Sequence, residues 1–157
     1  MDESLSAGLS TTEHVLCLRA YDWLLSGWER REDAFPKAIF DHISKKEGLD
    51  DDLWEHTIKQ AQVAYEKLRK AYDDQAENVE LNEVDMAALA VACHFRMMVI
   101  ANAPMEAHLR DEDYYEDLMA NPGLTIEQYI DGLKERYTSL VLRFSNQLPD
   151  VEVDSNG

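Results

Sequence analysis

The chain has little cysteine, proline and glycine. Its 157 residues include two Cys, four Pro and six Gly. Cys17 and Cys93 each stand alone among apolar neighbours, as reduced thiols in a core do, so neither a disulfide nor a zinc site is expected. No Gly-rich or Pro-rich linker and no internal repeat divides the chain. A sequence of this length without such a boundary predicts a single domain.

Signals for export and for membrane insertion are also missing. The first fourteen residues contain no basic segment followed by an apolar one, so no secretory signal is predicted. The longest apolar run, residues 86–101, is interrupted by His94 and Arg96 and is shorter than the ~20 residues that cross a bilayer. We therefore expect a cytoplasmic protein without membrane contact, in which this run forms a buried helix.

Helix signals recur along the chain, whereas strand signals do not. Capping residues and apolar spacing predict helices near residues 11–28, 33–48, 50–72, 82–101, 104–121 and 125–148. Residues 83–101 are apolar almost all the way round, and a helix of this kind has to be surrounded by others. The sequence thus predicts an all-α single-domain bundle of five to six helices over residues 1–148, packed around residues 83–101. Residues 149–157 are expected to form a flexible acidic tail.

Positive charge is scarce. The chain has 15 Lys and Arg against 32 Asp and Glu, which gives a net charge of −17. Between residues 71 and 133, fourteen carboxylates stand against two cations, Arg96 and Arg110. Such a charge would repel phosphate, so direct binding of nucleic acid is not expected. It would instead steer a basic protein toward this part of the surface.

No motif indicates an enzyme. The five histidines lack the Glu-x-x-His and His-x-x-x-His spacings of helical metal sites, and there is no Gly-rich phosphate loop. One loose pattern resembles the all-α nucleotide pyrophosphatases, in which Glu-x-x-Glu is followed by Glu-x-x-Asp. The matching residues are Glu29, Glu32, Glu47 and Asp50. This resemblance implies magnesium-dependent nucleotide hydrolysis as an alternative function; otherwise neither a catalytic residue nor a cofactor is predicted.

The acidity itself has several interpretations. It can serve solubility, or adaptation to a saline cytoplasm. It can also form a decoy, in which carboxylates imitate phosphates and occupy the cationic groove of a nuclease or another nucleic-acid-handling partner. In composition and size the chain is similar to phage inhibitors of host defence nucleases and to bacterial immunity proteins. A further alternative is an acidic chaperone or assembly adaptor that dimerises through the apolar seam of residues 54–72 or through the last helix.

We favour a non-enzymatic inhibitor whose partner-binding surface lies in the acidic stretch. On a helix over residues 105–120, Tyr114 and Leu118 would lie exposed beside Asp113 and Asp117, opposite Met105, Leu109 and Met119. An exposed tyrosine among acids is typical of an interface anchor, although a second packing layer would explain these two residues as well. The predicted partner-binding residues are Asp73, Asp74, Glu77, Glu80, Asp111, Glu112, Asp113, Tyr114, Asp117 and Leu118.

Overall fold

A computed structural model describes residues 5–8, 10–76, 78–103 and 105–146. Glu77 and the tail at residues 149–157 lie outside the described residues. Within the described ranges the elements follow in the order β1 (Leu5–Gly8), α1 (Thr11–Glu29), α2 (Ala34–Glu47), α3 (Asp51–Asp73), β2 (Asn78–Leu81), α4 (Glu83–Asn102), α5 (Met105–Leu109), α6 (Glu112–Ala120) and α7 (Ile126–Asn146).

Reciprocal capping boxes open three of the helices at the positions that the sequence predicts. At the start of α1, the Ser10 hydroxyl accepts the Glu13 backbone N–H at 3.1 Å, and the Glu13 carboxylate accepts the Ser10 N–H at 2.9 Å. The same reciprocal pattern opens α4 and α7, with the pairs Asn82 and Asp85, and Thr125 and Gln128. Each box satisfies two backbone N–H groups that a helix otherwise leaves unpaired.

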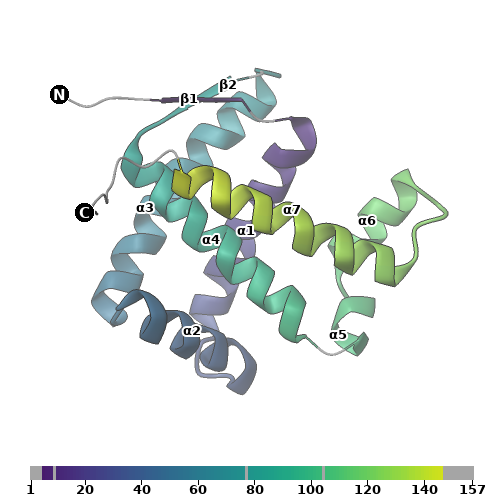
Figure 1. The fold of residues 1–157 in the computed structure, drawn as a ribbon, viewed down its shortest axis with the longest axis horizontal. Helices are drawn as coiled ribbons and strands as arrows, with labels where there is room; N and C mark the ends of the chain where they lie inside the picture. Colours follow the sequence, from purple (N-terminus) through teal and green to yellow (C-terminus); the bar gives the residue numbers. More distant parts are fainter. Residues whose placement is uncertain (1–4, 9, 77, 104, 147–157) are drawn as a thin grey trace.

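The central helix of the bundle is α4 (Figure 1). Helices α1, α2, α3 and α7 all pack against it. Its fully buried side chains include Met86, Leu89 and Phe95. The predicted all-α bundle around an apolar helix near residues 83–101 is therefore confirmed.

As a helix, α4 is longer than its uninterrupted apolar run. It has 20 residues, so by length and composition alone it could cross a membrane. In this fold, however, 61% of its most apolar window is buried inside the protein. Burial of this kind is typical of a core helix, whose apolar circumference is covered by neighbouring helices rather than by lipid.

A pair of short strands is a feature that the sequence does not predict. β1 pairs antiparallel with β2, with Leu5 opposite Leu81 and Gly8 opposite Asn78. Along β2, Val79 and Leu81 are buried whereas Asn78 and Glu80 are exposed. Four residues are too few for this alternation to indicate a strand, and the pairing partner lies far away in the sequence.

The two faces expected to form a dimer surface are used within the chain. On α3, Trp54, Ile58 and Leu68 are buried, and this helix packs against α1 and α4. On α7, Tyr137 and Phe144 are fully buried, and this helix packs along α4. Most of each seam is therefore covered within the chain, while Tyr72 at the end of the first seam is 39% exposed.

Two helical glycines give a matched test of the packing between α1 and α4. A Cβ atom at Gly27 would lie 2.6 Å from Cζ of the buried Phe95, whereas a Cβ atom at Gly132 would meet nothing within 4 Å. We predict that Gly132→Ala raises the free energy of unfolding by about 0.5–1 kcal/mol, because alanine is the better helix former. Gly27→Ala should lower it by about 1–3 kcal/mol through overpacking. Urea unfolding measures both, and shifts of the same sign would contradict the close approach at Phe95.

Candidate partner-binding surface

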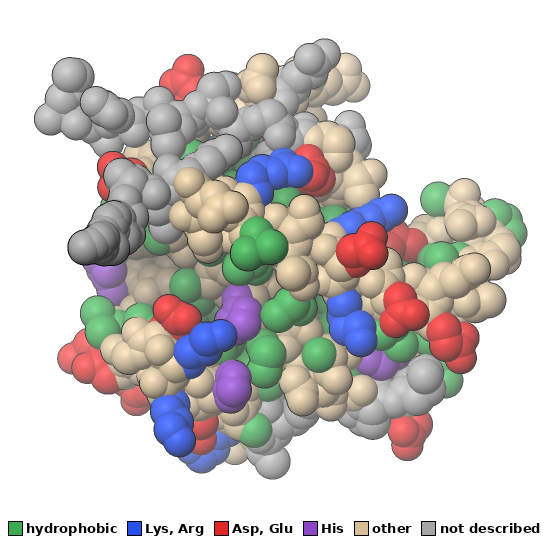
Figure 2. All heavy atoms as spheres, in the orientation of Figure 1, with side chains coloured by type: hydrophobic (Ala, Val, Ile, Leu, Met, Phe, Trp, Pro, Cys, Tyr) green, Lys and Arg blue, Asp and Glu red, His purple; other side chains and the backbone are tan. Residues whose placement is uncertain are grey.

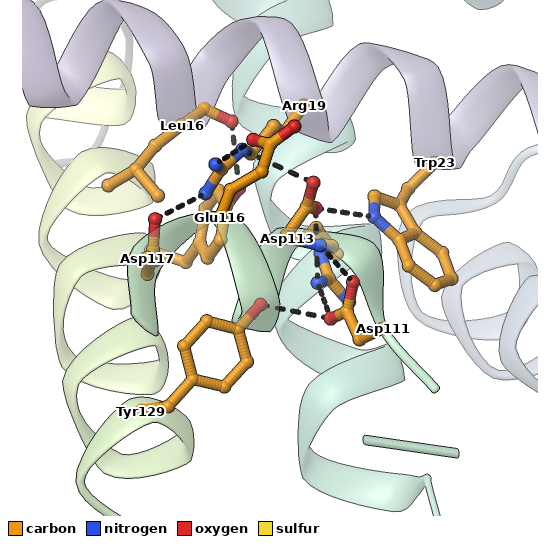
Figure 3. Close-up of polar contacts among 10 residues, drawn as sticks. Leu16, Arg19, Trp23, Asp111, Asp113, Glu116, Asp117 and Tyr129 are labelled. Carbon is orange, nitrogen blue, oxygen red and sulfur yellow. Dashed lines mark hydrogen bonds and ion pairs between the residues drawn. The ribbon is translucent and has the colours of Figure 1, made fainter. Parts of the chain in front are cut away.

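A network of charged side chains joins the start of α6 to the bundle (Figure 3). Arg96 of α4 is only 2% exposed, and its guanidinium donates a hydrogen bond of 2.8 Å to Asp111. The same carboxylate oxygen accepts the Tyr129 hydroxyl of α7 at 2.9 Å. The guanidinium also lies 4.1 Å from the ring centroid of Trp23 on α1. A buried cation needs this degree of compensation, because its desolvation is costly.

Arg19 of α1 makes a second set of ion pairs with α6. Its guanidinium nitrogens lie 2.6 Å from Glu116 and 3.3 Å from both Asp113 and Asp117. The indole N–H of Trp23 donates to Asp113 at 3.1 Å. Figure 3 shows these carboxylates turned toward α1. One arginine thus holds three acidic side chains of a single helix.

Burial and charge shift the pKa values of this network. Desolvation raises the pKa of Asp113, although Arg19 opposes the shift. Burial, reinforced by the charge of Asp111, raises the pKa of the Tyr129 hydroxyl far above its ordinary value. Burial alone would lower the pKa of Arg19, but the neighbouring carboxylates outweigh it and the pKa is raised. At neutral pH, Arg19 therefore stays charged and Tyr129 remains a hydrogen-bond donor.

Two of the predicted partner-binding residues are buried. Tyr114 is 8% exposed and Asp111 is 7% exposed, so the expectation that Tyr114 faces solvent is wrong. Its ring packs against Tyr129 with centroids 5.1 Å apart, and Leu118 is half-buried against the core. Asp111 explains the difference, because it interrupts the predicted helix and caps α6 by accepting the Asp113 N–H at 3.0 Å.

The exposed part of the predicted set divides into two surfaces. The exposed residues are Asp73, Asp74, Glu80 and Glu112. The first three lie where α3 leads into β2, and Glu112 lies on α6, which stands well apart from that connection in Figure 1. Asp73 and Asp74 also form ion pairs with Arg69 and Lys70, one turn earlier on α3. The acidic stretch is therefore continuous in sequence but not on the surface.

Both arginines of the network escaped sequence-based prediction as partners of α6. In the sequence, Arg96 interrupts an apolar run and is one of two cations in the acidic stretch, and Arg19 lies in a helix far from that stretch. One signal was present, because an arginine inside an otherwise apolar helix requires a carboxylate beside it. The spacing of residues along the chain does not indicate which carboxylate pairs with Arg96.

The four carboxylates that resemble a pyrophosphatase site are not gathered. Glu29 and Glu47 are the last residues of α1 and α2, Glu32 lies in the turn after α1, and Asp50 caps α3. All four are exposed. Across the part of the chain that the structure describes, no group of three or more His, Cys, Asp or Glu residues could hold a metal ion. The arrangement gives magnesium coordination no support.

A cavity of 590 Å³ lies between α1, α6 and α7. Its lining combines apolar side chains, among them Leu16 and Leu133, with Arg19, Glu116 and Asp117. Ligand pockets commonly have a volume of this order. Among the charged lining residues, Glu116 and Asp117 both pair with Arg19, and Arg136 also lines the cavity.

The free cysteines and two of the histidines show no sign of reactive chemistry. Cys17 and Cys93 are both free and fully buried. A hydrogen bond between the two thiols and burial raise the pKa of Cys93, which keeps the thiol protonated. Burial lowers the pKa of His14 and of His94, and Nε2 of each has no hydrogen-bond partner. Both imidazoles are therefore neutral at neutral pH, His14 in the interior and His94 half-buried.

Comparison with known proteins assigns the chain to no family. The chain matches no protein-family model, no curated protein and no solved structure. An all-α bundle is compatible with many functions, so the fold does not select one. The surface chemistry of α6 and of the connection between α3 and α4 is what bears on function.

The strength of the buried network can be tested by a double-mutant cycle on Arg96 and Asp111. We predict that Asp111→Asn, which retains the cap, lowers the free energy of unfolding by about 3–5 kcal/mol, because the buried Arg96 loses its hydrogen-bonded carboxylate and keeps only Asp113 at 3.7 Å. Combined with Arg96→Met, it should reveal a coupling of about 1–3 kcal/mol in chemical denaturation.

The exposed pair Lys37 and Asp41 is a matched control for this cycle. Its two side chains are 61% and 64% exposed and lie 3.0 Å apart. A pair of this kind contributes about 0.3–0.5 kcal/mol. Equal coupling energies in the two cycles would show that the buried network has no special role in stability.

Proposed function

We propose that the protein is a non-enzymatic acidic interaction protein that binds a basic nucleic-acid-handling partner and blocks its cationic surface. One observation carries the proposal, namely the imbalance of exposed charge. Between residues 71 and 133, nine described carboxylates are exposed, at Asp73, Asp74, Glu80, Glu83, Glu106, Glu112, Glu116, Glu127 and Asp131. Arg110 is the one exposed Lys or Arg in the described part of this stretch.

Burial of Arg96 sharpens this imbalance. The sequence contains two cations in the stretch, but the charge of Arg96 is enclosed in the core and compensates Asp111 there. Of the nine exposed carboxylates, Asp73, Asp74 and Glu116 pair with Arg69, Lys70 and Arg19, and the other six form no ion pair among the described residues. Helices project such carboxylates at regular intervals, and a groove lined by Lys and Arg attracts them as it attracts phosphates.

The uneven distribution favours an interaction over solubility as the reason for the acidity. Residues 1–70 carry fourteen acids against ten Lys and Arg, which is close to balance, whereas residues 71–133 carry fourteen against two. Selection for solubility or for a saline cytoplasm alone would spread the acids over the whole surface. In the fold this stretch supplies two separate acidic surfaces, at the α3–β2 connection and on α6, and each of them would steer a basic partner toward itself.

The other candidate functions have weaker support. A nucleotide hydrolase would need Glu29, Glu32, Glu47 and Asp50 around one magnesium ion, and these residues are dispersed over three helix ends and a turn. An adaptor that dimerises through α3 or α7 would need faces that are buried inside the chain. The proposed inhibitor acts in the cytoplasm, contacts no nucleic acid or membrane directly, and needs no cofactor.

Salt dependence tests the proposal. A partner captured by crosslinking in the native host and then purified should be basic, and its nucleic acid should be displaced by this protein in a fluorescence anisotropy assay. Raising NaCl from 0.05 to 0.5 M should weaken the complex by at least about 100-fold, because the screening length falls to a few ångströms. The double variant Glu106→Lys with Glu112→Lys should slow association by about tenfold.

The pair Glu55→Lys with Glu66→Lys is the matched control, since both residues are exposed on α3 in the charge-balanced part of the chain. It should change the association rate by less than about twofold, if only the acidic stretch steers the partner. A partner without excess positive charge, or an affinity that does not change with salt, would contradict the proposal.

A further inference from the structure

The outer face of α6 combines acidic and apolar side chains. Tyr115 is 47% exposed and Met119 is 85% exposed. Together with Glu112 and Glu116 they occupy positions i, i+3, i+4 and i+7, which lie on one side of a helix. Leu109, at the end of α5, is also exposed. We call Leu109, Glu112, Tyr115, Glu116 and Met119 the α6 outer face.

This concentration of exposed apolar side chains is local. Single exposed hydrophobic residues are ordinary on a protein surface. Outside the α6 outer face, the large exposed ones are Leu53, Val63, Tyr72, Val84 and Leu142, which are spread over α3, α4 and α7. The α6 outer face instead gathers three of them within eleven residues, on the side of the molecule where Figure 2 also shows carboxylates.

Contacts with the rest of the fold hold the α6 outer face in place. The Tyr115 hydroxyl donates a hydrogen bond of 2.6 Å to the Leu109 carbonyl, which fixes the ring across the break between α5 and α6. On the inner side of α6, Arg19 pairs with Asp113 and Asp117, and Arg96 pairs with the N-cap Asp111. A surface whose side chains are already ordered loses less conformational entropy when a partner binds.

Charge determines which kind of partner suits this surface. Residues 111–117 carry five carboxylates, and Arg19 and Arg96 compensate two of these charges. The segment therefore keeps a net charge of −3, and α6 itself contains no Lys or Arg. A partner that buried Tyr115 and Met119 with acidic groups of its own would be repelled.

We infer that the α6 outer face is the docking surface for a basic amphipathic segment of the partner protein. Lys or Arg side chains of that segment pair with Glu112 and share the exposed carboxylate of Glu116 with Arg19, while its apolar side chains pack on Tyr115 and Met119. Tyrosine and methionine are enriched at interfaces because they supply contact area with few constraints on the partner's shape. This inference rests on the proposed function and adds the surface and the chemistry of the partner.

Two synthetic peptides of equal length and charge test this inference. The Lys/Leu peptide has alternating Lys and Leu blocks and forms an amphipathic helix. The Lys/Ser peptide has Ser in place of every Leu. Anisotropy of the labelled peptides at 150 mM NaCl gives the Kd with the full-length chain. The Lys/Leu peptide should bind at least about tenfold more tightly than the Lys/Ser peptide, and Met119→Ser with Tyr115→Ser should remove that difference.

Two controls distinguish the loss of a binding surface from a loss of folding stability. Met119→Ser alone alters the most exposed of these side chains and should weaken Lys/Leu binding about threefold without changing the melting temperature. Leu142→Ser removes a comparably exposed side chain, 56% exposed, from α7 and should leave both affinities unchanged. If Leu142→Ser weakened Lys/Leu binding as much as the α6 variants do, the inference would be overturned.

The peptide pair also distinguishes the inference from the proposed function. If the Lys/Ser peptide binds in a salt-dependent manner and the Lys/Leu peptide binds no more tightly, the acidic surface attracts cations but the α6 outer face is not a docking site. If neither peptide shows salt-dependent binding, the electrostatic basis of the proposed function fails together with the inference.

Discussion

Compensation of the buried charge of Arg96 is the constraint on which the arrangement of α6 depends. The guanidinium sits on the central helix, where water cannot solvate it. Asp111 approaches it from the start of α6, Trp23 from α1, and Tyr129 supports Asp111 from α7. Three helices and the α5–α6 connection are thereby fixed around one charge. An apolar side chain would pack there at lower desolvation cost, but it would not fix the position of Asp111.

This internal use of charge separates two sets of carboxylates on one short helix. Asp113 and Asp117 turn inward toward Arg19, whereas Glu112 faces solvent. Acidity read from the sequence alone treats all of them as one surface. The structure assigns the inner set to holding α6 in place, and it leaves the outer set, with Tyr115 and Met119, as the part available to a partner.

Local patterns predicted most of the helices because the chain obeys local rules there. The capping boxes at Ser10 and Asn82, and the apolar circumference of residues 83–101, each follow from spacing alone. The failures occurred where a distant contact decides. Asp111 breaks the predicted helix over residues 105–120 through its pairing with Arg96, which turns Tyr114 inward, and β2 exists because β1 lies beside it. No single-sequence periodicity contains either contact.

Amide hydrogen exchange tests most directly whether α6 is held in place by charge. Tyr114 is the one buried residue of α6, so ion pairs must supply much of the attachment of this helix. In the Arg19→Gln variant, amides of residues 112–120 should exchange at least about tenfold faster than in the wild type, while amides of α4 keep their protection. Unchanged protection of α6, or equal loss of protection throughout the chain, would contradict a local electrostatic anchor.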